Sequence, residues 1–217
     1  MFERARAFLF DFDGTLIQQR IDFDLMRRQA LEVVARYGLP TEPLRKMYVL
    51  EMIDLVQAQL AAQEPARGRA FYAEVQQVIT ALELEAAEGA KAFPGVPEFL
   101  RTLRERGLAV GIVTRNCRAA VERVLQHNHL PYDVLLTRDD VAQVKPDPRH
   151  LAAALEILGI PAPQSVMCGD HPMDVLAGQR IGAMTVGVLP AGKPADYFAE
   201  VRPDLVVASV TEILDHW

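Results

Sequence analysis

Two aspartates, Asp11 and Asp13, stand two residues apart directly after the short apolar run Ala7–Phe10. If that run is a strand, the pair lies at its carboxyl end, where open α/β sheets bind their ligands. Two like charges this close are costly unless a cation or a shared proton relieves the repulsion. Mg²⁺, which prefers oxygen ligands, would relieve it. The alternative is a solvated turn in which the aspartates cap the backbone.

Two further polar groups stand between later apolar runs. Thr114 follows the run Leu108–Val113, and its hydroxyl and the neighbouring backbone amides can bind phosphate oxygens. Its alternative role is to cap the helix that follows. Lys145 begins the segment Lys145-Pro146-Asp147-Pro148. It is either a solvated loop charge or a counter-charge for nearby carboxylates that can also hold phosphate.

Asp170 and Asp174 lie four residues apart just after the run Ser165–Cys168. They repeat the metal-site logic of the first pair, and the alternative is helix capping by Asp170 or compensation of a helix dipole by Asp174. Each of these signals is modest alone. Together they indicate a site, because successive strand ends carry Asp/Asp, Thr, Lys and Asp/Asp in that order.

The elements that must position these side chains are short runs rich in Val, Ile and Leu, separated by helical patterns. Their hydrophobicity is continuous rather than alternating, which indicates strands buried on both faces of a parallel sheet. The helical patterns Glu98–Arg106 and Arg149–Leu158 are each followed by glycine, a frequent end of helices. The alternation predicts a doubly wound α/β fold with a parallel sheet. The predicted strands are Ala7–Phe10, Leu108–Val113, Val134–Leu136, Ser165–Cys168, Met184–Leu189 and Leu205–Ala208.

From about Asp22 to Gly89 the sequence has no strand pattern and instead shows three helical stripes of apolar residues. We therefore predict a helical domain, residues 18–90, inserted after the first strand of a core formed by residues 1–17 and 91–217. Pro65 and Gly68 are expected to separate the second and third helices. The stripes are Phe23, Met26, Ala30, Val33 and Tyr37; Leu44, Tyr48, Met52 and Leu55; and Phe71, Val75, Val78 and Leu82.

The 217 residues are enough for one substantial core and a smaller accessory domain. The net charge of −6 argues against a nucleic-acid surface, but local cations or a metal can still bind a small anion. The first residues lack the apolar stretch of a signal peptide, and no segment reaches the ~20 apolar residues of a membrane span. We expect a cytoplasmic protein with no membrane partner. Its two cysteines, Cys117 and Cys168, are expected to be buried and reduced.

With these motifs, the sequence resembles the haloacid dehalogenase superfamily over nearly its whole length. Asp11-Phe12-Asp13-Gly14-Thr15-Leu16 resembles the first motif of that family, Thr114 the second and Lys145 the third. Gly169-Asp170 through Asp174 resembles the fourth motif. The helical insertion resembles the cap of phosphoglycolate phosphatases and β-phosphoglucomutases. The resemblance implies a Rossmann-like core with a helical cap.

The resemblance also implies a Mg²⁺-dependent phosphatase, a phosphoric monoester hydrolase that acts on a small phosphorylated metabolite through an aspartyl-phosphate intermediate. Asp11 would attack phosphorus. Asp13 would protonate the leaving group and then activate water. Thr114, Arg115 and Lys145 would bind the phosphate group.

The implied metal ligands are the carboxylates of Asp11 and Asp170 together with the main-chain oxygen of Asp13, and Asp174 would support the metal or Lys145. The chain departs from many relatives in two places. Arg115 follows Thr114 where a smaller residue is common, and His171-Pro172 stands where Ser or Thr is common. Neither departure removes a residue that the implied mechanism requires. Both are compatible with a substrate pocket that differs from the pocket of those relatives. His171 is expected to be a packed imidazole rather than a neighbour of the metal.

Three alternatives stand beside the phosphatase. A phosphomutase of the β-phosphoglucomutase type keeps both aspartates, so the sequence discriminates it poorly. A dehalogenase would share Asp11, but relatives with that chemistry do not normally keep the second aspartate, so Asp13 disfavours it. A non-catalytic binding protein on the same scaffold is disfavoured because the set of polar residues is intact. The physiological substrate and the oligomeric state do not follow from the sequence.

Overall fold

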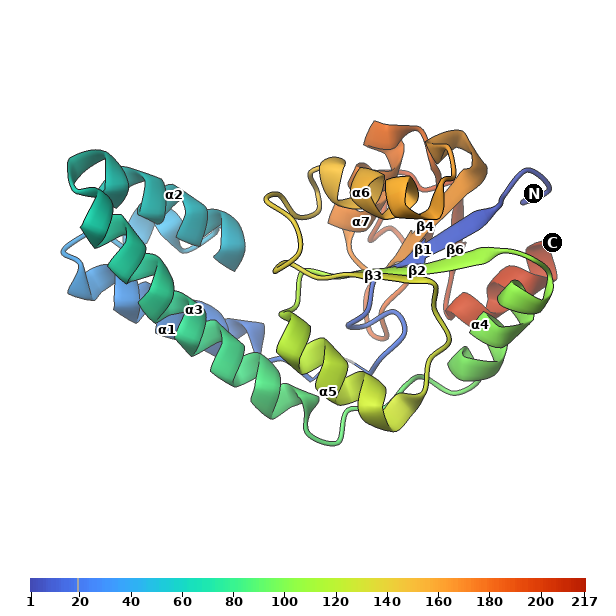
Figure 1. Ribbon diagram of the computed structural model, residues 1–217, viewed down its shortest axis with the longest axis horizontal. Helices are drawn as coiled ribbons and strands as arrows, with labels where there is room; N and C mark the ends of the chain where they lie inside the picture. The colour runs from blue at the N-terminus through green and yellow to red at the C-terminus, as the bar shows by residue number, and fades with distance from the viewer. Residues whose placement is uncertain (19) are drawn as a thin grey trace. The chain divides into compact units, whose positions relative to one another are not determined.

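The computed structural model describes residues 1–18 and 20–217 (Figure 1). The chain folds into two compact units. The sheet unit consists of Met1–Gln19 and Gly89–Trp217, and the helical unit consists of Arg20–Glu88. The boundaries expected from the sequence, 17/18 and 90/91, lie two residues from these bounds at each connection.

A parallel sheet of six strands forms the centre of the sheet unit, in the spatial order β3-β2-β1-β4-β5-β6. All four residues of β1 are buried, as expected for a strand that is covered on both faces. The six predicted strands are confirmed, with differences of one residue at some ends. The strands are β1 Ala7–Phe10, β2 Ala109–Val113, β3 Val134–Leu136, β4 Ser165–Gly169, β5 Met184–Val188 and β6 Leu205–Val207.

Helices cover both faces of this sheet (Figure 1), so the predicted doubly wound α/β fold is confirmed. Glycines in the left-handed conformation end two of the helices as predicted, since Gly107 and Gly159 have φ of 78° and 65°. The helices of the sheet unit are α4 Val96–Glu105, α5 Arg118–Asn128, α6 Arg149–Leu158 and α7 Pro172–Ile181, and 3₁₀ turns lie at Ala162–Gln164 and Val210–His216.

The two faces of β1 divide the core of the sheet unit into two layers. Leu9 packs in a cluster with apolar residues of α6 and α7. Phe8 and Phe10 point to the opposite face, because successive strand residues alternate between faces. There the ring of Phe10 meets the ring of Phe99 edge to face, with centroids 5.8 Å apart, and Phe8 stacks on Trp217. The strand is thus fixed from both sides.

The order of the strands reverses between β1 and β4. The chain runs from β1 outward to β2 and β3 on one side, and from β4 outward to β5 and β6 on the other. Ligands of open α/β sheets bind in the crevice at such a switch point. Asp11 directly follows β1 and Asp170 directly follows β4, so both lie at the reversal.

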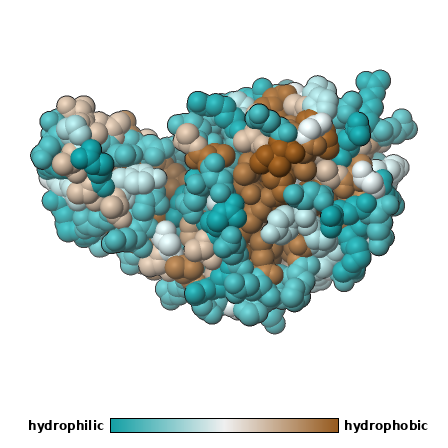
Figure 2. Space-filling model, in the orientation of Figure 1, coloured by the Kyte–Doolittle hydropathy of each residue, from teal (hydrophilic) through white to brown (hydrophobic). Residues whose placement is uncertain are grey.

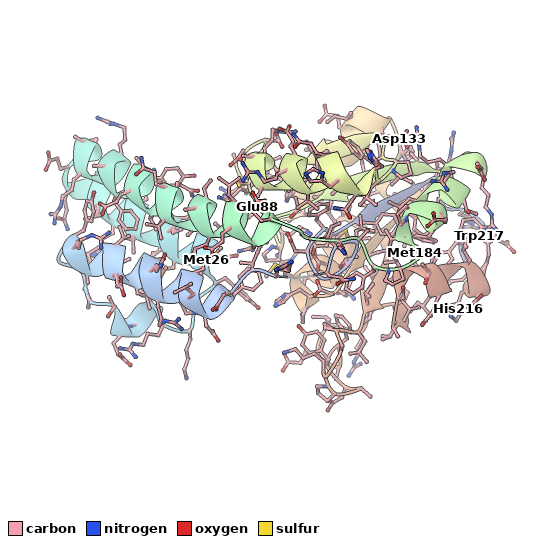
Figure 3. The ribbon with its side chains drawn as sticks, turned by 90° about the horizontal axis from the view of Figure 1, so that it is seen from below. Met26, Glu88, Asp133, Met184, His216 and Trp217 are labelled. Atoms are coloured by element: carbon pink, nitrogen blue, oxygen red, sulfur yellow. The ribbon has the colours of Figure 1, made fainter. Side chains whose placement is uncertain are left out.

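The helical unit has an apolar core of its own. Its buried residues come from all three helices and include Met26 of α1, which Figure 3 labels. Asp22 caps α1 by accepting a hydrogen bond from the backbone N–H of Leu25 at 2.8 Å. The helices are α1 Phe23–Arg36, α2 Val49–Gln63 and α3 Pro65–Ala87, with a 3₁₀ turn at Glu42–Leu44.

Part of the predicted pattern of the helical unit is wrong. Tyr48 and Leu55 were expected on a buried stripe but are 47% and 49% exposed, and Phe23 is 51% exposed. The predicted second stripe joined the 3₁₀ turn Glu42–Leu44 to α2 as though both were one helix. Because α2 begins only at Val49, its buried face has a different phase from the predicted stripe.

The two cysteines, Cys117 and Cys168, are buried and free, as predicted. In the part of the chain that the structure describes, we find no helix with the length and apolar character needed to cross a membrane. Hydrophilic side chains cover most of the surface that Figure 2 presents, and apolar side chains are also exposed there on the sheet unit.

Gly68 was expected to separate α2 from α3, but it lies within α3, whose first residue is Pro65. The glycine is buried against the preceding helix. A Cβ atom at this position would lie 2.7 Å from the Cβ of Ala61 and 2.9 Å from the Cα and the backbone nitrogen of that residue. The close approach of α2 and α3 therefore depends on the absence of a side chain.

We predict that Gly68→Ala destabilises the protein, although alanine in an exposed helix position is favoured over glycine by about 1 kcal/mol. The added methyl group meets backbone atoms that cannot rotate away, and overpacking of this kind costs about 1–3 kcal/mol. Chemical denaturation measures the change. Ala66→Gly, at an exposed position of the same helix, is the control for helix propensity alone. A Gly68→Ala variant more stable than the parent would contradict the close packing.

Candidate active site

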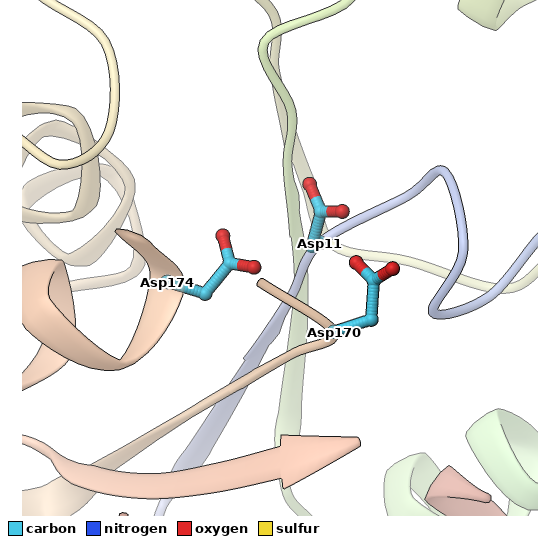
Figure 4. A group of neighbouring side chains, drawn as sticks. All are labelled: Asp11, Asp170 and Asp174. Carbon is cyan, nitrogen blue, oxygen red and sulfur yellow. The ribbon is translucent and has the colours of Figure 1, made fainter. Parts of the chain in front are cut away.

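Three carboxylates gather at the switch point of the sheet. Asp11 follows β1, Asp170 follows β4, and Asp174 lies in the first turn of α7 (Figure 4). Each offers an oxygen, and these oxygens all lie within 4.8 Å of one another. Strand pairing places the first two, because Phe10 pairs with Cys168 and the backbone N–H of Asp11 donates to the Cys168 carbonyl at 2.9 Å.

Glycine permits this approach between the first and fourth motifs. Gly14 has φ of +85°, and a Cβ atom there would lie 2.3 Å from Oδ2 of Asp170. Thr15 donates a hydrogen bond from its hydroxyl to Oδ1 of Asp170 at 3.4 Å. A Cβ atom on Gly169 would lie 2.3 Å from Cγ of Asp174. The loop after β1 therefore lies directly against the carboxylate of Asp170.

The ammonium group of Lys145 is buried among these carboxylates. Its Nζ lies 2.7 Å from Oδ1 of Asp11 and 2.8 Å from Oδ1 of Asp174, and the side chain is 0% exposed. Burial by itself lowers the pKa of Lys145, but the two carboxylates outweigh burial, and the pKa lies above its usual value. Lys145 is therefore the counter-charge predicted from the sequence. The alternative of a solvated loop charge is wrong.

The loop that carries Lys145 is held by its backbone. Its N–H donates to Nδ1 of His150 at 3.4 Å, and its carbonyl accepts a hydrogen bond from the guanidinium of Arg115. Burial and the nearby ammonium lower the pKa of His150 to about 3, so its ring is neutral and Nδ1 can accept. Arg115, expected to bind phosphate, thus contacts the main chain of another expected phosphate ligand.

Asp174 takes part in the capping of α7 and also pairs with Lys145, while Asp170, the capping residue considered from the sequence, is not the N-cap. Its Oδ2 accepts a hydrogen bond from the backbone N–H of His171 at 3.0 Å, while its Oδ1 faces Lys145. His171 is the N-cap of α7, and its Nδ1 accepts from the N–H of Met173 at 3.1 Å. The helix is capped reciprocally, with Pro172 in its first turn. The departure His171-Pro172 therefore has a structural role at the start of this helix.

Asp13, the predicted acid/base, lies near the loop that follows β2. Its Oδ2 accepts a hydrogen bond from Nδ2 of Asn116 at 2.9 Å. Thr114 is buried in the same loop, and its hydroxyl oxygen accepts from the backbone N–H of Asn116 at 3.1 Å. The alternative role of Thr114 as the N-cap of α5 is wrong, because Cys117 occupies that position.

Asn116 is a site residue to which the sequence analysis gave no role. It lies two residues after Thr114, and its amide side chain was the one available signal. An asparagine in a loop after a strand is most often part of a turn, so residue type and spacing did not predict its contact with Asp13. The two residues are 103 positions apart in the chain.

The electrostatics of the carboxylates favour a bound cation. Burial, followed by the charges of Asp11 and Asp174, raises the pKa of Asp170 to about 8. Burial also raises the pKa of Asp11, although Lys145 opposes the shift. Three carboxylate oxygens within 4.8 Å of one another fit a hard divalent ion such as Mg²⁺, which would favour their ionised forms. The solvated turn considered for Asp11 is wrong, since its carboxylate pairs with the buried ammonium of Lys145 at 2.7 Å and its side chain is only 14% exposed.

Fold and site together define a class of enzyme: a doubly wound α/β hydrolase whose switch point holds a carboxylate cluster and a buried lysine. Comparison with known proteins identifies the family. Residues 8–188 match the sequence profile of the haloacid dehalogenase-like hydrolases, and the chain belongs to this family. The predicted membership is therefore confirmed, and the chain is a hydrolase of the phosphatase type.

Relatives with recorded names match nearly the whole chain. The chain is 30% identical over 217 residues to pyrophosphatase PpaX of Bacillus cereus (strain G9842), covering 97% of this chain and 95% of the relative. It is 35% identical over 217 residues to pyrophosphatase PpaX of Bacillus mycoides (strain KBAB4). The match to this second relative covers 97% of this chain and 96% of the relative.

Solved structures share the fold at lower identity. A predicted phosphoglycolate phosphatase from Haemophilus somnus superposes with a TM-score of 0.67 at 21% identity. The match covers 100% of this chain and 99% of that chain. At this identity the likeness supports the fold alone.

We predict that the metal-free protein loses stability as the pH rises from about 4 to about 8. Asp170 has a folded-state pKa raised from 3.8 to about 8, so its contribution to stability is present below its unfolded pKa and is lost as it ionises beside two carboxylates. Mg²⁺ should therefore stabilise the protein more at pH 9 than at pH 6. In a chain of this size each kcal/mol shifts Tm by about 2–4 °C, which thermal unfolding resolves.

Asp170→Asn isolates this effect, because an amide of the same shape does not ionise. The variant in EDTA should lose less stability between pH 6 and pH 9 than the parent, and Mg²⁺ should raise its Tm by less. Asp215→Asn changes an exposed aspartate and is the matched control. Equal pH dependence in parent and Asp170→Asn would mean that Asp170 does not carry the shift.

Proposed function

We propose that the chain is a Mg²⁺-dependent phosphatase that hydrolyses a small phosphorylated metabolite through an aspartyl phosphate on Asp11. The observation that carries the proposal is the buried contact of Lys145 with Asp11, 2.7 Å long, beside the carboxylates of Asp170 and Asp174. A carboxylate nucleophile needs a group that neutralises charge on the incoming phosphoryl group without consuming the nucleophile itself. A fixed ammonium on one oxygen of Asp11 leaves the other oxygen for attack.

In the first step an oxygen of Asp11 forms a bond to phosphorus, and the bond from phosphorus to the leaving oxygen breaks. Asp13 gives its proton to that oxygen, which departs as an alcohol or acid. In the second step Asp13 takes a proton from water as the water oxygen attacks phosphorus. The bond to Asp11 breaks, inorganic phosphate leaves, and both aspartates return to their starting states.

Phosphate binding is assigned to residues from two further loops. Lys145 would contact a phosphate oxygen as well as Asp11, and the hydroxyl of Thr114 would donate to another. Arg115, tied to the Lys145 carbonyl, would keep that loop in place and add positive charge. Mg²⁺, held by Asp11, Asp170 and the main-chain oxygen of Asp13, would neutralise charge on the transferred group.

The names of the relatives guide the choice of substrates. Two relatives at 30% and 35% identity are called pyrophosphatases, which supports inorganic pyrophosphate as one substrate to test. The solved structure from Haemophilus somnus is named for phosphoglycolate, a phosphate monoester. A panel should contain pyrophosphate, phosphoglycolate, a sugar 1-phosphate and p-nitrophenyl phosphate. Isomerised sugar phosphate in place of released phosphate would identify a phosphomutase.

We predict that the parent releases inorganic phosphate from members of this panel with Mg²⁺ and that Asp11→Asn lowers the rate by at least about 10³-fold. The amide cannot attack phosphorus, so the two-step route is lost. Asp215→Asn, an exposed change of the same chemistry, should match the parent. Full activity of the parent in excess EDTA would contradict the metal requirement. Activity of Asp11→Asn above a few per cent, with deamidation excluded by mass spectrometry, would remove Asp11 as nucleophile.

We also propose that the helical unit is a cap that determines substrate preference. The chain leaves and re-enters the sheet unit at adjacent positions. Ile17 forms an antiparallel bridge with Ala92, and the N–H of Gln18 donates to the Lys91 carbonyl at 2.8 Å. Because the helical unit buries its apolar residues in its own core, its removal should not expose the core of the sheet unit.

Replacement of residues 20–88 by a short Gly/Ser linker should leave a folded sheet unit that hydrolyses p-nitrophenyl phosphate but discriminates poorly among the other substrates. A single well-placed contact discriminates by roughly 10–200-fold, so the spread of kcat/KM values should narrow by about that factor. Circular dichroism and thermal unfolding check that the variant is folded. An unchanged order and spread of preferences would show that the helical unit does not determine specificity.

A further inference from the structure

Asn116 makes a contact to Asp13 that the reaction scheme above does not use. The residue follows β2 in the loop before α5 and is 6% exposed. Its Nδ2 donates to Oδ2 of Asp13 at 2.9 Å. The contact joins the loop of Thr114 to the residue proposed as acid and base.

The orientation of this amide follows from its other contacts. The backbone N–H of Cys117 donates to Oδ1 of Asn116 at 2.8 Å, so the amide nitrogen must face Asp13. The main chain of Asn116 is also held on both sides. Its N–H donates to the hydroxyl oxygen of Thr114 at 3.1 Å, and its carbonyl accepts from the N–H of Arg138 at 3.2 Å. The donor that faces Asp13 is therefore fixed in place.

We propose that Asn116 is a positioning residue that holds the carboxyl group of Asp13 through Oδ2 in the orientation that proton transfer needs. The inference rests on the proposed function, in which Asp13 is the acid in the first step and the base in the second.

The chemical type of Asn116 suits a group that must change its protonation state in each cycle. A neutral amide can donate to the carbonyl oxygen of a carboxylic acid as well as to a carboxylate. A lysine at this position would favour the ionised form of Asp13, and an aspartate would repel it. Asparagine thus keeps Asp13 oriented in both steps without an added charge.

The geometry separates this role from phosphate binding. The bond from Asn116 to the hydroxyl oxygen of Thr114 comes from the main chain, and the bond to Asp13 comes from the side chain. Asn116→Ala removes the second bond and keeps the first. Asn116→Asp keeps the shape and an acceptor for the N–H of Cys117, but it replaces the donor toward Asp13 by an oxygen.

The test measures the phosphorylation step by rapid mixing with phosphoglycolate and with p-nitrophenyl phosphate. General acid–base assistance is worth about 10²–10⁴-fold, so partial misplacement of Asp13 should cost Asn116→Ala roughly 10–100-fold on phosphoglycolate. The loss on p-nitrophenyl phosphate should be much smaller, because its leaving group needs little protonation. Asn116→Asp should lose at least as much as Asn116→Ala. For Asn116→Ala, the inhibition constant of inorganic phosphate should stay within about 2-fold of the value for the parent, since the Thr114 contact is kept.

Cys117→Ala, which changes the adjacent buried side chain and keeps its backbone N–H, is the control and should leave the ratio of the two substrate rates unchanged. Equal losses on both substrates, or a weaker inhibition by inorganic phosphate, would mean that Asn116 acts on the fold or on phosphate. If thermal unfolding shows that Asn116→Ala is not folded, Asn116→Asp alone allows the comparison of the rate losses on the two substrates.

A double-mutant cycle with Asp13→Asn separates the inference from the proposed function. If Asn116 acts through Asp13, adding Asn116→Ala to Asp13→Asn should change the rate on phosphoglycolate by less than about 2-fold. Full additivity would overturn the positioning role while leaving Asp13 as the acid/base. If Asp13→Asn lowers the phosphorylation rate equally for both leaving groups, the acid/base assignment in the proposed function fails, and the inference fails with it.

Discussion

The buried ammonium of Lys145 between Asp11 and Asp174 is the interaction on which the rest of the active site depends. Loss of one partner of a buried ion pair typically costs about 3–5 kcal/mol, because the remaining charge has no water to stabilise it. The contacts of 2.7 Å and 2.8 Å therefore require all three side chains together. With Asp170 ionised as well, the three carboxylates and one ammonium leave two negative charges, which is the charge that one divalent cation neutralises.

The surrounding chain is arranged so that these charges can approach. Gly14 and Gly169 lie where a side chain would collide with Asp170 and with Asp174. The ring of His150 accepts a hydrogen bond from the backbone N–H of Lys145. With a pKa of about 3, this ring is neutral and adds no second positive charge inside the fold. The two glycines thus allow the carboxylates to approach, and the neutral ring of His150 holds the Lys145 loop without adding a charge.

The helical unit contrasts with this crowded centre. Its three helices bury an apolar core of their own, and the chain connects it to the sheet unit through two backbone segments paired at Ile17 and Ala92. A unit with its own core can vary in sequence without disturbing the charges at the ends of the strands. This separation is why the helical unit is the proposed specificity element.

Much of the fold and of the site was predictable from residue types and their order. Continuous apolar runs are enough to indicate strands buried on both faces, so the bounds of the sheet followed closely. The parallel order then brought Asp11, Lys145, Asp170 and Asp174 to one edge, as their position after strands implied. The helices of the insertion were less predictable. Periodicity alone does not show where a 3₁₀ turn ends and α2 begins, so Tyr48 was assigned to a buried face.

Only the tertiary structure decided which atoms meet. Asn116 lies 103 residues from Asp13, and no local pattern connects an amide in one loop with a carboxylate in another. His171 and Asp174 cap α7 reciprocally, which follows from the start of the helix and not from the motif. Gly68 resembles a helix breaker in the sequence, yet it lies inside α3, where Ala61 leaves room for a hydrogen atom alone. Residue order determined which elements form and which edge holds the chemistry, because hydrophobic periodicity is local. Which side chains contact each other depends on close packing between elements that are distant in the chain, and a local pattern does not contain that information.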